Sequence, residues 1–261
     1  MLALISPAKK LDFETEPTLS DHTMPDLIED SEVLVKTARK LSRNKLAQTM
    51  KLSAQLAELN FQRYQDFSTP FHLGNAKQAA LVFNGDTYVG LKAETLNKRD
   101  MAFAQKHLRI LSGLYGVLRP LDLIQPYRLE MGAKFRPPRR TDLYHFWDDR
   151  ITENLNQALN GHKDKTIINL ASNEYFKAVK PKLLDGQVIT PVFKEIKDGQ
   201  SRTIGMFAKQ ARGSMARFMI TNRVKVPEGL KAFGTNGYEY RDDLSDEQQW
   251  VFTRPQPAPP K

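Results

Sequence analysis

Hydrophobic positions along the chain fall into short continuous apolar runs and longer stretches with helical spacing. Short continuous runs predict buried strands. They cover residues 2–6, 79–86, 107–113 and 166–172. Each run ends in small or polar residues, and a predicted helical segment follows it further along the chain. If these strands are parallel neighbours, their C-terminal ends meet at one sheet edge, where α/β proteins bind ligands.

Two further segments, 187–196 and 201–208, predict an antiparallel hairpin, because the Asp198-Gly199 pair between them is a hairpin turn signal. Helices are predicted from Pro25 onward and over residues 45–59, 60–67, 94–107, 145–160 and 209–223. The mixture predicts an α/β (mixed α+β) fold, with a central mixed sheet and helices around it. We expect a single domain over residues 1–253 and a disordered proline-rich tail over 254–261.

One segment, 112–132 (SGLYGVLRPLDLIQPYRLEMG), shows neither the helical spacing of apolar residues nor the apolar–polar alternation of a strand. Pro120 and Pro126 prevent a continuous helix, because proline lacks an N–H and restricts the residue before it. The segment is too rich in Leu, Ile and Tyr to be disordered. Long irregular segments in compact domains are commonly functional. We therefore expect a buried or half-buried loop that places charged side chains in a cleft.

Charge is distributed unevenly along the chain, which carries +9 overall. Residues 1–100 balance, with 13 basic and 13 acidic side chains, whereas residues 101–225 hold 22 basic and 11 acidic ones. Residues 226–261 hold 4 and 6. A basic region of this kind suits a polyanion such as nucleic acid. A mildly basic protein without such a role fits the charge equally well.

The chain contains no cysteine, which excludes disulfides, iron–sulfur clusters and thiolate zinc sites. No apolar run approaches the roughly 18 residues that a membrane-spanning helix needs. The N-terminal sequence MLALISPAKK lacks the basic region that opens a signal peptide. We expect a cytoplasmic protein with no membrane partner, acting as a monomer.

Charged residues at the predicted strand ends and in segment 112–132 predict a basic cleft. Its cations would be Lys9, Lys10, Arg119, Arg128, Lys209 and Arg212, and its carboxylates Asp86, Asp122, Glu130 and Glu174. Three of these carboxylates, Asp122, Glu130 and Glu174, are the candidate catalytic groups. For Asp122 and Glu130, ion pairing with Arg119 and Arg128 is the alternative to an acid/base role.

The chain contains none of the common sequence motifs for nucleotide binding or catalysis that we searched for: no P-loop, GxGxxG, GxSxG or HExxH. The five histidines show no ligand spacing, so we predict no metal site and no cofactor. Ser6 and Lys9 could form a Ser–Lys pair, although a turn serine beside a solvent lysine is the favoured reading. We expect a binding protein rather than an enzyme.

The helices predicted at 45–59 and 60–67 meet at a very short break, Ala57-Glu58-Leu59-Asn60. They could form a helix-hairpin-helix, whose N–H groups contact a DNA phosphate, flanked by Lys51, Asn60 and Arg63. The break has no glycine and contains an acidic residue. An ordinary antiparallel helix pair is therefore favoured by the residues alone.

Five strings resemble the YaaA peroxide-stress family of bacteria. They are SPAK-x-LDF (6–13), GDTYVGL (85–91), LSGLYGVLRPLDLIQPYRLEMG (111–132), NLAS-x-EYFK-x-VKPK (169–182) and FAK-x-ARG-x-MARF (207–218). The resemblance implies a cytosolic protein that limits hydrogen peroxide damage and is associated with low intracellular free iron. It also implies a positively charged cleft, and binding of duplex, bent or junction DNA through a helix-hairpin-helix at residues 45–67.

Two hypotheses therefore stand. The first is a DNA-binding stress protein that uses Lys51, Asn60 and Arg63, the cleft cations, or both. The second is an enzyme acting on a nucleotide or nucleic-acid substrate in the basic cleft. It rests on the acidic, basic and tyrosine residues at the converging strand ends. A protein that only binds DNA rarely needs so many carboxylates beside its cations, because carboxylates repel phosphate.

Overall fold

The computed structural model describes residues 1–17 and 19–257. Its centre is a parallel three-stranded unit in which β1 pairs with both β3 and β6. The strands span Leu2–Ile5 (β1), Leu108–Ser112 (β3) and Ile167–Leu170 (β6). Every residue of the three is buried, as expected for strands covered on both faces. Three of the four predicted strands are thus confirmed.

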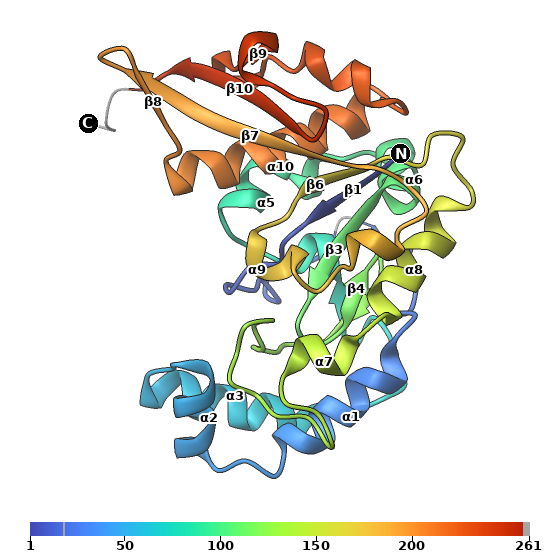
Figure 1. The fold of residues 1–261 in the computed structure, drawn as a ribbon. Helices are drawn as coiled ribbons and strands as arrows, with labels where there is room; N and C mark the ends of the chain where they lie inside the picture. The colour runs from blue at the N-terminus through green and yellow to red at the C-terminus, as the bar shows by residue number, and fades with distance from the viewer. Residues whose placement is uncertain (18, 258–261) are drawn as a thin grey trace.

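The full sheet has the order β4-β3-β1-β6-β7-β10-β9, with β8 paired to β7 (Figure 1). β7 and β10 are parallel, whereas β4, β8 and β9 run antiparallel to their partners, so the sheet is mixed as predicted. The strands span Gly116–Leu118 (β4), Val188–Lys197 (β7), Gln200–Arg202 (β8), Glu239–Arg241 (β9) and Gln249–Pro255 (β10). A separate two-stranded ribbon joins β2 (Lys77–Gln78) and β5 (Leu123–Ile124).

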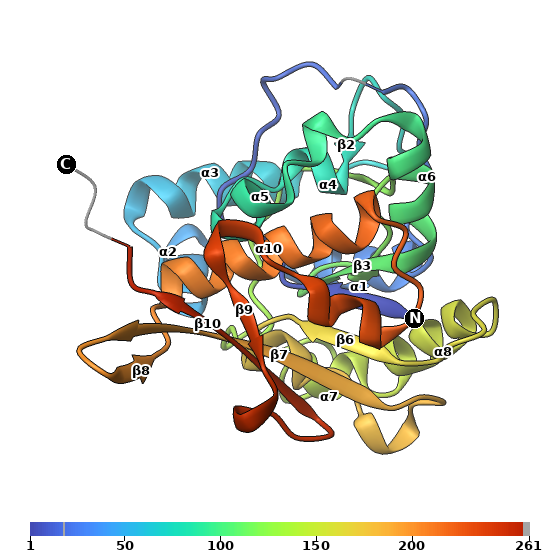
Figure 2. The ribbon, with the colours of Figure 1, turned by 90° about the horizontal axis from the view of Figure 1, so that it is seen from above.

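Helices cover both faces of the sheet in a single domain (Figure 2). One face carries α4 (Ala79–Val82), α5 (Asp86–Leu91), α6 (Lys98–His107) and α10 (Gly205–Thr221). The other carries α7 (Leu143–Trp147) and α8 (Arg150–Leu159). The remaining α-helices are α1 (Ile28–Ala38), α2 (Arg43–Met50), α3 (Ala54–Asp66) and α9 (Asn173–Phe176). Short 3₁₀ turns span Ala93–Thr95, Pro181–Leu183, Pro227–Ala232, Thr235–Gly237 and Asp242–Leu244.

The strand predicted at residues 79–86 is wrong. Ala79–Val82 forms α4, and α5 begins at Asp86. A short apolar run does not distinguish a buried strand from a buried helical turn. Here both edges of β1 are already occupied by β3 and β6, and the nitrogens of Ala79 and Ala80 donate to Asp122 and Pro120 carbonyls.

The hairpin at Asp198-Gly199 is confirmed, since both residues have positive φ between β7 and β8. Its second strand is shorter than predicted. Only residues 200–202 pair with β7, and α10 begins at Gly205 rather than at residue 209. Residues 205–208 therefore belong to the helix, and Ala208 is buried in the core.

The break between the predicted helices at 45–59 and 60–67 is also misplaced. Residues 57–60 lie inside α3, and the chain turns at Lys51-Leu52-Ser53 instead. Lys51 ends α2 in the left-handed conformation, and the Ser53 side chain accepts a hydrogen bond from the Leu56 nitrogen as the N-cap of α3.

Strand β10 continues through Arg254 and Pro255, so the sheet extends into the segment predicted as tail. Residues 258–261, the end of that tail, lie outside the described residues. Within residues 1–17 and 19–257, no helix has the combined length and apolarity needed to cross a bilayer.

Candidate functional site

A cleft of about 490 Å³ opens beside the C-terminal ends of β1 and β6. Its lining comes from the loop after β1, the start of α5, residues 127–130, α9 and α10. Eight of the ten predicted cleft residues line it: Lys9, Lys10, Asp86, Arg128, Glu130, Glu174, Lys209 and Arg212. Arg119 and Asp122 do not.

The loop after β1 is fixed to two neighbouring segments. The Asn84 nitrogen donates to the Lys10 carbonyl at 2.9 Å, which ties the loop to the start of α5. On the other side, the Ser172 nitrogen donates to Ser6 Oγ at 2.9 Å, which ties it to the end of β6. The cleft floor is therefore built by parallel strand ends, even though residues 79–86 are not a strand.

Helices α5 and α10 approach each other through glycine. A Cβ on Gly213 would lie 1.7 Å from the Thr87 carbonyl oxygen, and one on Gly90 would lie 2.1 Å from the Gln210 carbonyl oxygen. Only glycine permits this backbone contact. It places Asp86, the first residue of α5, and Arg212, which precedes Gly213, on the wall of the same cleft.

One side of the cleft is internally neutralised. Glu130 Oε1 lies 2.9 Å from Lys9 Nζ and 3.4 Å from Arg128 Nη2. Glu174 Oε1 accepts a hydrogen bond from the Gly132 nitrogen at 2.9 Å. These contacts make Glu130 and Glu174 braces for the loops around the cleft, and they reduce the net charge that this side presents.

The side formed by α5 and α10 differs. Lys209, Arg212 and Asp86 have no ion pair and no side-chain hydrogen bond to any of the described residues. Burial lowers the pKa of Arg212, because the guanidinium loses hydration without gaining a carboxylate partner. An anion that enters the cleft can contact Lys209 and Arg212 without displacing a carboxylate, and the same holds for the exposed Lys10 in the loop after β1.

Tyrosine side chains form part of the lining, and the charge pattern did not single them out. Tyr88 Oη donates to the Ser6 carbonyl at 3.1 Å, and Tyr127 Oη lies 2.7 Å from Ser112 Oγ. Burial raises the pKa of Tyr88, Tyr127 and Tyr175, so these phenols stay neutral. Their positions beside Gly85-Asp86, Arg128 and Glu174 in the sequence were the available signal.

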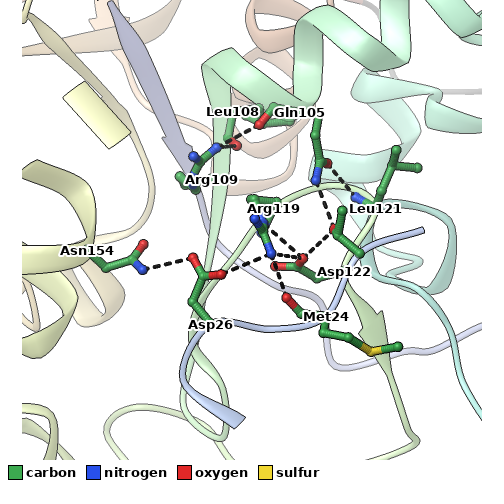
Figure 3. A network of polar contacts seen from close by, with 10 residues as sticks. Met24, Asp26, Gln105, Leu108, Arg109, Arg119, Leu121, Asp122 and Asn154 are labelled. Carbon is green, nitrogen blue, oxygen red and sulfur yellow. Dashed lines mark hydrogen bonds and ion pairs between the residues drawn. The ribbon is translucent and has the colours of Figure 1, made fainter. Parts of the chain in front are cut away.

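Arg119 and Asp122 lie in a separate network, so their placement in the cleft was wrong (Figure 3). Arg119 binds Asp122 through its backbone nitrogen (2.7 Å) and its Nε (3.0 Å), and contacts Asp26 and the Met24 carbonyl through Nη2. Thr23 Oγ1 donates to Asp122 Oδ1 at 2.6 Å. The pair fastens the segment before α1 to segment 112–132, as the ion-pair alternative predicted.

Segment 112–132 is more regular than predicted, because it contains β4 and β5. Gly116 has φ +69, and a Cβ there would lie 2.9 Å from the Trp147 ring. Only residues 127–130 reach the cleft. The charged residues of the segment therefore divide: Arg128 and Glu130 face the cleft, while Asp122 is buried elsewhere.

The predicted hairpin residues separate in the same way. Lys51 is exposed at the α2–α3 connection. Asn60 is fully buried and donates to the Leu56 carbonyl at 2.8 Å, so it cannot contact a phosphate. Arg63 is half-buried, and its pKa is lowered by burial and by the charge of Arg128. Arg63 lies in the last turn of α3 rather than at its beginning, and it is not among the residues that line the cleft.

The Ser6–Lys9 pair is not formed, since Ser6 Oγ bonds to Ser172 and Lys9 Nζ to Glu130. In the described part of the chain, no group of three or more His, Asp or Glu side chains is arranged to hold a metal ion.

Comparison with known proteins agrees with the sequence strings. A family model described as "Peroxide stress protein YaaA" matches residues 1–244. A UPF0246 protein of Magnetococcus marinus is 54% identical over 254 residues, which cover 97% of this chain and 99% of that protein. A UPF0246 protein of Alteromonas mediterranea is 54% identical over 256 residues, covering 98% and 99%. One from Paraburkholderia phytofirmans is 51% identical over 256 residues, covering 97% and 98%.

Proposed function

The chain belongs to the YaaA peroxide stress family, and from that premise we propose that it is a DNA-binding protein that protects the cell, including its DNA, from hydrogen peroxide damage. The associated fall in intracellular free iron belongs to the same proposal, as an indirect consequence or an effect at DNA. We further propose that it works in the cytoplasm as a monomer.

The observation that carries DNA binding is the α2–α3 connection. Lys51 is exposed beside the N-terminus of α3, where Ser53, Ala54 and Gln55 are exposed as well. The first N–H groups of a helix have no intrahelical partner and attract phosphate, and a lysine beside them adds a point charge. This geometry supports a phosphate contact at Lys51-Leu52-Ser53 in place of the residues first predicted.

Duplex binding measured by fluorescence anisotropy between 50 and 200 mM salt tests the proposal. Lys51→Glu is expected to weaken binding whatever the DNA sequence, and to reduce the salt slope by about one unit. Lys182→Glu, which reverses an exposed charge in the 3₁₀ turn Pro181–Leu183, is the matched control and should leave binding unchanged. The double variant Lys209→Gln/Arg212→Gln probes the cleft. Unchanged binding in both Lys51→Glu and the double variant would refute the assigned surface.

A second candidate is an enzyme acting on a nucleotide or nucleic-acid substrate in the cleft. The observation that favours it is Asp86, a half-buried carboxylate without a partner among the described residues, on the same wall as Arg212. Asp86→Asn and Glu174→Gln are expected to abolish peroxide protection while leaving folding and DNA binding intact. Full protection in both variants would exclude a catalytic role for these carboxylates.

A further inference from the structure

We propose that the cleft binds one nucleoside phosphate unit, with its phosphate held by Lys209 and Arg212 of α10. The unit is either a free nucleotide or a single nucleotide extruded from a strand. This inference deepens the second candidate function, because it names the class of substrate and the residues that receive its charge.

Ion pairing favours Lys209 and Arg212 of α10 over Lys9 and Arg128 as the phosphate contacts, and the exposed Lys10 is a further unpaired cation of the lining. Lys9 and Arg128 already share Glu130, so a phosphate on their side would compete with a carboxylate held at 2.9 Å. Lys209 and Arg212 have no such competitor among the described residues. Two cations one helical turn apart, with one guanidinium capable of bidentate contact, suit a phosphate group.

The absence of a protein partner for Arg212 among the described residues supports a ligand role. Its pKa is lowered by burial alone, and no described carboxylate or carbonyl accepts from its guanidinium. The Arg212 side chain lines the cleft and remains partly accessible there, so its N–H donors are available to a ligand. Arg217, on the same helix, is different: its Nη1 donates to the carbonyls of Leu91 and Lys92 and has a structural role. Arg212 gains its partner when an anion enters.

The size and remaining lining of the cleft suit one nucleotide. About 490 Å³ falls within the roughly 300–1,000 Å³ of typical small-ligand pockets. Tyr88, Tyr127 and Tyr175 line the cleft as neutral, largely buried side chains, and they add apolar wall against which a nucleoside can pack. Asp86 supplies an unused acceptor for a sugar hydroxyl or a base amino group.

Titration calorimetry on the full chain tests the site with dAMP, deoxyadenosine and inorganic phosphate, and with a DNA duplex carrying one unpaired adenosine against its fully paired counterpart. The matched variants are Arg212→Gln and Arg99→Gln, which each remove one arginine charge. Arg99 is exposed on α6 and has no ion pair to the described residues. Arg212→Gln should weaken dAMP or unpaired-nucleotide binding roughly ten- to hundredfold, and Arg99→Gln should change it less than twofold.

Two further readouts separate a ligand role from a structural one. Without ligand, Arg212→Gln should unfold at the same temperature as the parent or higher, because the substitution removes no hydrogen bond or ion pair to the described residues. Deoxyadenosine should bind at least tenfold more weakly than dAMP. Binding of dAMP supports a free nucleotide, and binding of the unpaired-adenosine duplex alone supports an extruded one.

The proposal is overturned if neither dAMP nor the unpaired nucleotide binds, if Arg212→Gln binds as tightly as the parent, or if deoxyadenosine equals dAMP. Failure of the DNA-binding proposal can be distinguished from failure of the nucleotide site. Lys51→Glu lies outside the cleft, so it should weaken duplex binding and leave dAMP binding unchanged.

Discussion

Arg119 Nη2 lies 3.0 Å from Oδ1 of Asp122, a carboxylate with only 1% of its side chain exposed. The two residues stand among the charges that the sequence assigned to a cleft, yet they hold segment 112–132 against the chain before α1 (Figure 3). Arg119 and Arg212 therefore represent two uses of arginine in one protein, the first paired and structural, the second without a partner in the empty cleft.

Arg119→Gln should destabilise the fold by about 2–3 kcal/mol, because it leaves a buried carboxylate with fewer donors. Urea unfolding at pH 7 measures the change, and Arg99→Gln should stay within about 0.5 kcal/mol of the parent. Burial raises the pKa of Asp122. The folded carboxyl therefore takes up a proton at a higher pH than the unfolded one, and the deficit of Arg119→Gln should shrink as the pH falls. A deficit independent of pH would contradict this explanation.

Gly213→Ala should disrupt the packing of α5 on α10. The new methyl would lie 1.7 Å from the Thr87 carbonyl oxygen, which is backbone and cannot rotate away. We expect a loss of about 3 kcal/mol or more, typical of strong overpacking. Gly205→Ala in the first turn of the same helix has no neighbour within 4 Å and should be neutral or stabilising by roughly 0.4–1 kcal/mol. Thermal unfolding of the pair checks this, and equal effects would rule out the close contact.

Glu130→Gln should increase affinity for anions, since it frees Lys9 and Arg128 from their shared carboxylate. We expect a two- to tenfold gain in DNA affinity, about 0.4–1.4 kcal/mol, with a steeper salt slope. Glu94→Gln, at an exposed position, is the control. Loss of peroxide protection in Glu130→Gln with intact folding would instead assign Glu130 a catalytic part.

His162 should make the fold sensitive to acid. Burial lowers its pKa to about 4. The neighbouring His107 ring lies 4.5 Å away between centroids, and burial is also the main cause of its lowered pKa. Between about pH 6.5 and 4 the unfolded chain binds protons that the folded chain does not, so stability should fall as the pH falls through this window. In His162→Asn the urea unfolding midpoint should depend less on pH over that range. A pH dependence equal to that of the parent would exclude His162 as a cause of the acid sensitivity.

Local sequence was sufficient for the three central parallel strands, of which β1 and β6 end at the cleft. The runs at β1, β3 and β6 are continuous and apolar because helices cover both faces, and Asp198-Gly199 sets the hairpin through its own backbone preference. The same reasoning failed at Ala79–Val82, where an apolar run forms a helix whose first nitrogens donate to the Asp122 and Pro120 carbonyls. It also misplaced the turn between α2 and α3, where Ser53 is the capping signal.

What the sequence alone determined is the family, the mixed sheet and the set of charges at its C-terminal edge. Tertiary structure decided which of those charges remain available. Within segment 112–132, Asp122 is drawn into a buried pair with Arg119, while Arg128 and Glu130 reach the cleft, and Glu130 also binds Lys9 from far away in the sequence. Whether a charged side chain is neutralised depends on its distance from an opposite charge that can lie far away in the sequence. The order of residue types along the chain does not give that distance.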